Sequence, residues 1–193
     1  MIMTYNPDIH HRRSIRLKNF DYASVGAYFV TISVQNRISL LGKISGSQIK
    51  LSEMGEIAKQ CWLDMPGHLN NVELDEFVVM PNHIHGIIVL TNICRGVQLN
   101  APTQFNALAP TTSEPRHEHF SKISPMKKTL AVIIRTYKAA VTTICRQSGF
   151  CQFRWQRNYY EHIIRNDVEM NRIREYINNN AINWEDDEYF MEA

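Results

Sequence analysis

No uninterrupted apolar segment in the sequence approaches the roughly 20 residues that a membrane-spanning helix requires. Residues 1–20 also lack an apolar block of the kind found in signal peptides, and the four cysteines form no C-x-x-C pair. These absences argue against a membrane partner, a zinc knuckle and a redox dithiol. We therefore expect a cytoplasmic protein whose thiols are reduced.

The sequence also has little net charge, but its charges are distributed unevenly. The formal net charge is +2 over 193 residues, a length that suits one domain spanning 1–193. Residues 116–165 hold ten lysines and arginines against two acids, whereas residues 166–193 hold two against eight. A basic segment beside an acidic tail fits a face that binds a polyanion, and it also fits an ordinary solvated surface.

The first half of the chain predicts strands around one helix. The run GAYFVTISVQNR after Gly26 predicts a strand, and residues 42–52 are interpreted as a partner strand that contains a turn. Ser52 predicts the N-cap of a helix that MPGH closes. The runs VELDEFVVMP and HIHGIIVLT predict an antiparallel hairpin that turns near Pro81, because proline cannot continue a central ladder.

The second half begins with a segment that lacks any hydrophobic period. Residues 92–123 contain three prolines and many small polar residues, which predicts a long loop. Ser124 and Pro125 predict the start of a helix, with an apolar stripe at steps of four and three between 130 and 144. A strand is expected within QFRWQRNYYEHIIR, and Asn166 with Glu169 resembles a capping box that opens a last helix through Ile177.

Two histidines one residue apart, His83 and His85, lie in an otherwise apolar strand segment. Alternation along a strand points residues two apart to the same face, so the two imidazoles are expected to converge. Such a pair can bind a divalent metal, or it can satisfy ordinary hydrogen bonds in a half-buried sheet.

Tyr176 and Asn180 are four residues apart near the end of the last predicted helix, so they share a face. They can be a core tyrosine and a helix-ending asparagine. Combined with the histidines, they can also form a reaction centre, in which His83, His85 and the Asn180 amide oxygen bind Mg²⁺ or Mn²⁺. Tyr176 would then attack a phosphate and leave a phosphotyrosine and a free hydroxyl.

The motifs MPNHIHGII, WQRNYYEHIIRN and REYINNN resemble those of the REP-associated tyrosine transposases, relatives of the small HUH single-strand transposases. The opening RRSIRLKNFDYASVGAYFVTI is also similar to the start of that family. The resemblance runs from Arg12 to Trp184 and is interrupted by residues 92–123.

This resemblance implies an α+β fold with a ferredoxin-like core, in which helices pack on a central antiparallel sheet. It implies that His83, His85 and Asn180 are the metal ligands and that Tyr176 is the nucleophile. The family cleaves and rejoins single strands at palindromic hairpins through a 5′-phosphotyrosine with a free 3′-hydroxyl. Single-stranded or hairpin DNA is therefore the expected partner, bound by a monomer or a homodimer.

The sequence departs from the family at Ala181, where proline usually follows the asparagine. Alanine allows the helix to continue, which bears on the placement of Asn180. Tyr159 and Tyr160 are alternative nucleophiles, although neither has an amide ligand four residues further on.

Three groups of cations are candidate DNA contacts. Residues 1–20 form a basic arm, the predicted long helix begins with two lysines, and three arginines are interleaved with aromatic residues, a pattern that serves phosphate contact and base stacking. Each group can also be a solvated surface, and Trp155 can belong to the core. The cations are Arg12, Arg13, Arg16, Lys127, Lys128, Arg154, Arg157 and Arg165.

Two other functions remain open at the level of sequence. A protein of this fold can bind hairpin DNA without cutting it, for instance if Ala181 displaces the third ligand. A nucleotide hydrolase or phosphodiesterase is the second, but it usually requires further histidines, threonines or carboxylates that the sequence does not place.

Overall fold

The centre of the computed structural model is a four-stranded antiparallel sheet in the order β4-β5-β1-β6. The structure describes residues 24–46, 48–92, 129–184, 187 and 189–190. The strands of the sheet are β1 (Gly26–Ser33), β4 (Val72–Val79), β5 (His83–Leu90) and β6 (Tyr160–Ile164). All three neighbouring pairs are antiparallel.

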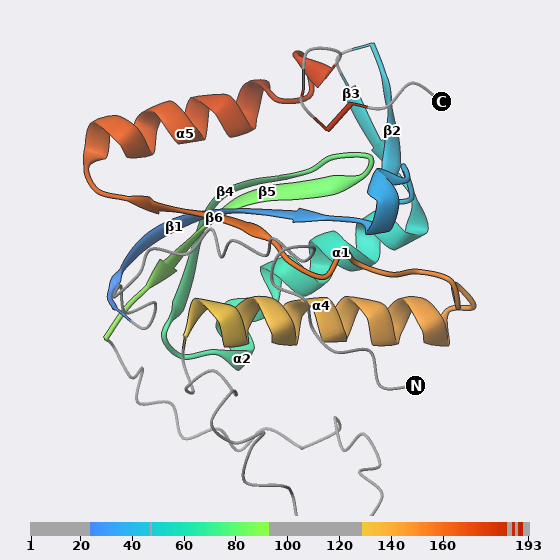
Figure 1. Ribbon diagram of the computed structural model, residues 1–193, viewed down its shortest axis with the longest axis horizontal. Coiled ribbons are helices and arrows are strands. Elements are labelled where there is room, and N and C mark those ends of the chain that lie inside the picture. Colours follow the sequence, from blue (N-terminus) through green and yellow to red (C-terminus); the bar gives the residue numbers. More distant parts are fainter. Residues whose placement is uncertain (1–23, 47, 93–128, 185–186, 188, 191–193) are drawn as a thin grey trace, which may run out of the picture.

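Helices cover both faces of this sheet. Figure 1 shows α5 (Asp167–Asn179) on one side, and α1 (Glu53–Leu63) and α4 (Leu130–Gln147) on the other. The succession β1-α1-β4-β5-α4-β6 with this strand order is the ferredoxin-like arrangement predicted from the sequence. The fold class is therefore confirmed as α+β.

Alternation along β1 and β5 divides their side chains between the two faces. Tyr28, Val30 and Ile32 of β1 point into the larger core beneath α1 and α4. Phe29 of β1 and Ile87 of β5 point the other way, into a smaller cluster completed by α5 and β6. The histidines of β5 lie on this second face, because they are in phase with Ile87.

Capping side chains fix where two helices begin. Ser52 accepts a hydrogen bond from the Gly55 N–H at 3.1 Å and opens α1, as predicted. Asn166 accepts from the Glu169 N–H at 2.9 Å and opens α5. The Glu169 carboxylate accepts from the Arg165 N–H rather than from that of Asn166, so the cap is a variant of the predicted capping box.

The long helix α4 begins later than predicted. Its N-cap is Thr129, whose hydroxyl accepts from the Val132 N–H at 3.4 Å, and its first residue is Leu130. The predicted N-cap Ser124 lies outside the described residues, as do Lys127 and Lys128; a second capping residue, Thr129, lies directly before the apolar stripe.

The segment MPGH follows the end of α1, as predicted, and forms the short helix α2 (Met65–His68). One smaller prediction was wrong. Residues 42–51 do not pair with β1; they form a separate hairpin of β2 (Gly42–Ser45) and β3 (Gln48–Leu51). A 3-10 turn, η1 (Gln35–Arg37), joins β1 to this hairpin.

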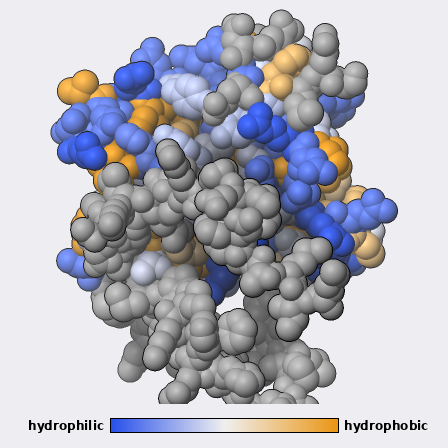
Figure 2. Space-filling view, in the orientation of Figure 1, coloured by the Kyte–Doolittle hydropathy of each residue, from blue (hydrophilic) through white to orange (hydrophobic). Residues whose placement is uncertain are grey.

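Figure 2 shows hydrophilic residues over much of the described surface of one face, with the hydrophobic residues in separate patches. None of the helices in the described ranges is long and apolar enough to cross a membrane. The predicted loop, from residue 93 onward, and the basic arm at 1–20 lie outside the described residues.

Candidate active site

His83 and His85 lie side by side on the α5 face of the sheet, as strand alternation predicts. Their ring centroids are 4.3 Å apart. The side chains are buried, with 0% of His83 and 1% of His85 exposed. Two imidazoles therefore meet in a site shielded from bulk water.

Asn82, in the turn before β5, determines which ring nitrogen of His83 carries the hydrogen. Its two amide hydrogens are donated to the carbonyls of Arg37 and Tyr189, at 3.0 and 2.8 Å. The amide oxygen therefore faces His83 Nδ1 at 2.7 Å and can only accept, so Nδ1 carries the hydrogen. His83 Nε2 is left with a lone pair, and it has no hydrogen-bond partner in the described structure.

His85 lies between two hydroxyl groups. Thr31, directly opposite in the β1–β5 register, places its hydroxyl 2.8 Å from Nδ1. The Tyr176 hydroxyl lies 3.2 Å from Nε2. With the hydrogen on Nδ1 and Thr31 accepting, Nε2 presents a lone pair, which is the form that a metal ligand requires.

Burial keeps both imidazoles neutral. Desolvation lowers the pKa of His83 well below its ordinary value, and the neighbouring His85 and Arg37 lower it further. Desolvation alone lowers the pKa of His85 to about 3. Both rings are therefore deprotonated at neutral pH, as binding of a metal demands.

Helix α5 brings Tyr176 and Asn180 to the histidines. Tyr176 is 43% exposed, although its hydroxyl reaches His85, and its ring packs edge-on against His85. Asn180 is buried at the C-cap of α5, which ends at Asn179, and its backbone keeps helical angles. Ala181 lies in the turn that follows. The Asn180 Oδ1 atom is buried and has no hydrogen-bond partner in the described structure.

Asp187 is a member of the site that sequence reasoning missed. Its Oδ2 atom accepts from Asn180 Nδ2 at 3.1 Å and from the Tyr176 hydroxyl at 3.5 Å, and lies 4.0 Å from His85 Nε2. Ligand atoms of His83, His85 and Asp187 all lie within 4.8 Å of one another, so this group can hold a metal ion. The only signal was a run of four acids at 185–188, in which no spacing singles out the third.

Tyr189 covers the histidine pair. Its ring lies 4.6 Å from the His83 ring, and the Arg37 guanidinium lies 4.6 Å from the centre of the Tyr189 ring. The Tyr189 N–H is bound by Asp187 Oδ1 at 2.7 Å. Tyr189 therefore packs directly on the histidine pair.

The alternative tyrosines lie elsewhere. Tyr160 begins β6, pairs with Thr31 in the sheet and is 45% exposed, so it flanks the site without a contact to the histidines among those described. The Lys138 ammonium lies 5.8 Å from the Tyr159 ring, which places Tyr159 beside α4. Among the three candidate nucleophiles, Tyr176 is therefore the tyrosine whose hydroxyl lies within hydrogen-bond distance of His85.

The predicted cationic groups are only partly brought together. Arg154 and Arg157 line one cavity with α4, whereas Arg165 lies beyond the far end of β6. Trp155 is a core residue, packed edge-on against Phe153. The predicted contacts Arg12, Arg13, Arg16, Lys127 and Lys128 lie outside the described residues.

Comparison of the fold identifies its class. The structure of the REP-associated tyrosine transposase bound to a REP hairpin matches with a TM-score of 0.54 at 19% identity, over 88% of this chain and 74% of that chain. The chain therefore has the α+β fold of the REP-associated tyrosine transposases, as its motifs predict. No protein-family model matches the sequence.

A sequence relative identifies the family. An uncharacterized protein of Haemophilus influenzae is 42% identical over 192 residues, covering 100% of both chains. The chain belongs to the same family as this Haemophilus influenzae protein.

Proposed function

We propose that the protein is a metal-dependent single-stranded DNA endonuclease and strand transferase that acts at palindromic hairpins through a covalent 5′-phosphotyrosine on Tyr176. The transposase fold supports this class of activity. We also propose that residues 1–193 form a single transposase domain, that it acts as a monomer or a homodimer, and that it works on the chromosome in the cytoplasm.

One observation supports this function above the others. The Tyr176 hydroxyl lies 3.2 Å from His85 Nε2, across 91 residues of sequence. The same site holds two buried atoms with lone pairs and no hydrogen-bond partner in the described structure, His83 Nε2 and Asn180 Oδ1. Buried polar atoms of this kind are rare in folded proteins, and a bound cation would satisfy both.

The donor set fits a hard or borderline divalent ion. Imidazole nitrogens, an amide oxygen and a nearby carboxylate are compatible with Mg²⁺ or Mn²⁺, and the site contains no thiolate to favour a softer metal. We assign His83, His85 and Asn180 as the ligands, with Asp187 beside them. When bound, the ion would polarise the scissile phosphate and neutralise part of its charge.

In the proposed reaction, the Tyr176 phenol oxygen attacks the phosphorus of the scissile phosphodiester. Its proton passes to Asp187 Oδ2, the carboxylate oxygen that the hydroxyl already faces at 3.5 Å. The new bond joins the tyrosine to the 5′-phosphate, and the bond between phosphorus and the 3′ oxygen breaks. That oxygen takes up a proton and leaves as a free 3′-hydroxyl, and the reverse attack by a 3′-hydroxyl rejoins the strand.

The partner we propose is hairpin DNA with a single-stranded extension, since the matching transposase was solved with a REP hairpin bound. The two most exposed tyrosines near the histidines, Tyr160 and Tyr176, offer ring faces on which unpaired bases can stack. Arg154, Arg157 and Arg165, with the cations outside the described residues, are the proposed phosphate contacts.

The test is a denaturing gel of the protein incubated with end-labelled hairpin DNA drawn from repeats around its own gene, with Mn²⁺ or Mg²⁺. We expect a covalent protein–DNA band that requires the metal and disappears in Tyr176→Phe. Tyr160→Phe is the matched control, because Tyr160 lies on the same face of the sheet and its hydroxyl makes no described contact with His85.

A band that survives Tyr176→Phe would reassign the nucleophile to Tyr159 or Tyr160. Binding of the hairpin without any covalent band, under every metal condition, would instead identify a non-cleaving DNA-binding protein of the same fold.

A further inference from the structure

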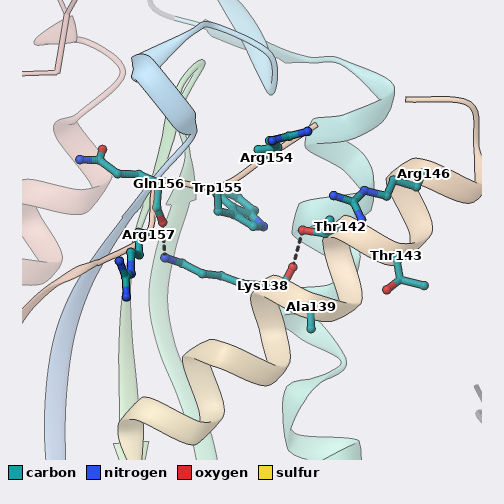
Figure 3. A pocket seen from close by; sticks show the side chains of 9 residues that line it. All are labelled: Lys138, Ala139, Thr142, Thr143, Arg146, Arg154, Trp155, Gln156 and Arg157. Atoms are coloured by element: carbon teal, nitrogen blue, oxygen red, sulfur yellow. Dashed lines mark hydrogen bonds between the residues drawn. The ribbon is translucent and has the colours of Figure 1, made fainter. Parts of the chain in front are cut away.

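A second candidate site lies outside the histidine centre, in a cavity of about 490 Å³ between α4 and residues 154–157. Figure 3 shows the α4 side chains on one wall and the 154–157 segment on the other. The residues that line it include four cations, two threonine hydroxyls and no carboxylate. These cations and threonines are Lys138, Thr142, Thr143, Arg146, Arg154 and Arg157. We call this cavity the α4 groove.

The walls of the α4 groove are held together by Lys138. Its ammonium donates to the carbonyls of Gln156 and Asn158, at 2.9 and 2.8 Å, and so fixes the extended segment against α4. The floor is the Trp155 ring, which is 9% exposed and packs against Phe153 and Tyr137. The shape of the groove is therefore set by hydrogen bonds to the backbone and by a core side chain.

Within the described residues, the arginines of the α4 groove have no carboxylate partner. Among the salt bridges of the described residues, none pairs Arg146, Arg154 or Arg157 with a carboxylate. Burial lowers the pKa of Lys138 to about 8, which reflects an ammonium poorly solvated by water. The Trp155 Nε1–H also has no acceptor in the described structure. A ligand with several anionic oxygens would neutralise the three arginines together.

The α4 groove is close to the histidine site along the sheet. The Gln156 N–H donates to the Ser33 carbonyl at 2.8 Å, and Ser33 is paired with His83 in the β1–β5 register. Since neighbouring strands lie about 4.8 Å apart, the backbone at Gln156 is roughly 10 Å from that of His83. Residues 157–159 then lead directly to Tyr160 at the edge of the site.

The positions of the exposed aromatic rings indicate which site suits duplex DNA and which suits single-stranded DNA. No exposed ring lines the α4 groove, because Trp155 is buried, so unpaired bases have no stacking platform there. Exposed rings lie instead at the histidine site, where Tyr160 and Tyr176 are about half exposed. Cations without rings are suited to a phosphate backbone whose bases are already paired and stacked.

We propose that the α4 groove binds the phosphodiester backbone of the duplex stem of the DNA hairpin, so that the single-stranded extension passes over Tyr160 to the histidine site. Arg146 and Thr143 contact phosphates from the helix wall, and Arg154 and Arg157 contact them from the opposite wall. This inference rests on the proposed function and adds to it the site that recognises the stem.

The experiment compares the binding of two labelled DNAs at several salt concentrations, without divalent metal so that no cleavage occurs. One is a stem-loop with a single-stranded extension, and the other is the extension alone. The variant Arg146→Gln/Arg154→Gln removes one exposed arginine from each wall. The control Lys50→Gln/Lys59→Gln removes two exposed lysines from β3 and α1, away from the groove.

We expect the groove variant to bind the stem-loop about tenfold more weakly, with the slope of log affinity against log salt reduced by about 2, one unit for each lost phosphate contact. Binding of the stemless extension should change less than about twofold, and the control should bind both DNAs as the native chain does. Arg146→Lys/Arg154→Lys should retain most of the affinity. Unfolding midpoints establish that each variant is folded.

An unchanged affinity of the groove variant for the stem-loop would overturn the proposal, as would an equal loss for both DNAs or an equal loss in the control. These outcomes are separate from the chemistry. Loss of stem-loop binding in the groove variant supports the α4 groove as the stem site even if no covalent product forms. If the groove variant forms the covalent product as the native chain does, the reaction is supported and the α4 groove is not the stem site.

Discussion

Asn82 Oδ1 accepts a hydrogen bond from His83 Nδ1 at 2.7 Å, and this contact determines which nitrogen of His83 faces the site. Both amide hydrogens of Asn82 are held by carbonyls, so the amide cannot turn to present its nitrogen to the ring. Asn82 therefore leaves His83 Nε2 with the lone pair that the proposed metal site requires, since a hydrogen bond to one ring nitrogen fixes the tautomer of a ligating imidazole.

Asn82→Ala should weaken the binding of Mn²⁺ by about 10- to 100-fold, since the His83 ring loses the group that fixes its orientation and its tautomer. Titration of the protein with Mn²⁺, followed by calorimetry, measures the change. Asn82→Asp keeps an acceptor oxygen for Nδ1 and should bind more tightly than Asn82→Ala. Native affinity in Asn82→Ala would contradict this positioning role of Asn82.

Gly86→Ala should destabilise the fold by about 1–3 kcal/mol, the usual effect of overpacking a core. Gly86 lies between His85 and Ile87 on the larger core, and a Cβ there would clash with the Trp62 ring and lie 3.0 Å from the Phe77 Cβ. Gly67→Ala in α2 is the control, because nothing lies within 4 Å of its added Cβ. Urea unfolding of both variants compares them, and equal midpoints would contradict the clash.

The fold could be predicted from the sequence because its signals are local. Alternation in β5 placed both histidines on one face, and the spacing of Tyr176 and Asn180 placed them on one face of α5. The beginning of α4 was missed, since Ser124 and Thr129 are both capping residues and only the packing of Leu130 into the core decides between them.

The remaining members of the site depend on pairings between distant segments. Thr31 reaches His85 because of the β1–β5 register, 54 residues apart, which no local pattern encodes. Asp187 is one of four consecutive acids, and only the path of the chain after α5 selects it. The role of Asn82 likewise depends on the carbonyls of Arg37 and Tyr189, from opposite ends of the described chain.

Arg174→Gln should slow formation of the covalent product several-fold while leaving Mn²⁺ affinity unchanged. Arg174 donates to both oxygens of Asp75, at 2.8 and 2.6 Å, and so ties α5 to β4 two residues from Tyr176. Its loss lets the nucleophile drift from the histidines. Single-turnover gels measure the rate, with Arg172→Gln on the same helix as the control.

The same pair gives a double-variant test. If the contact acts as a unit, Asp75→Asn should slow the reaction as Arg174→Gln does, and the double variant should be no slower than either. Additive losses would contradict a shared positioning role. Because Arg174 lowers the pKa of Asp75, the contribution of the pair to stability is fully present above the ordinary Asp pKa of about 3.9 and is lost as the pH falls below it.

Asp187→Asn should slow covalent capture at neutral pH by more than about tenfold, because the phenol then lacks a carboxylate to take its proton. Raising the pH should recover part of the rate, since the Tyr176 proton can then pass to hydroxide. The rate of capture against pH, measured at saturating Mn²⁺, separates this effect from weaker metal binding. A native rate and pH profile at saturating Mn²⁺, with the loss confined to low Mn²⁺ concentrations, would instead make Asp187 a ligand or a support for Asn180, whose amide nitrogen donates to it at 3.1 Å.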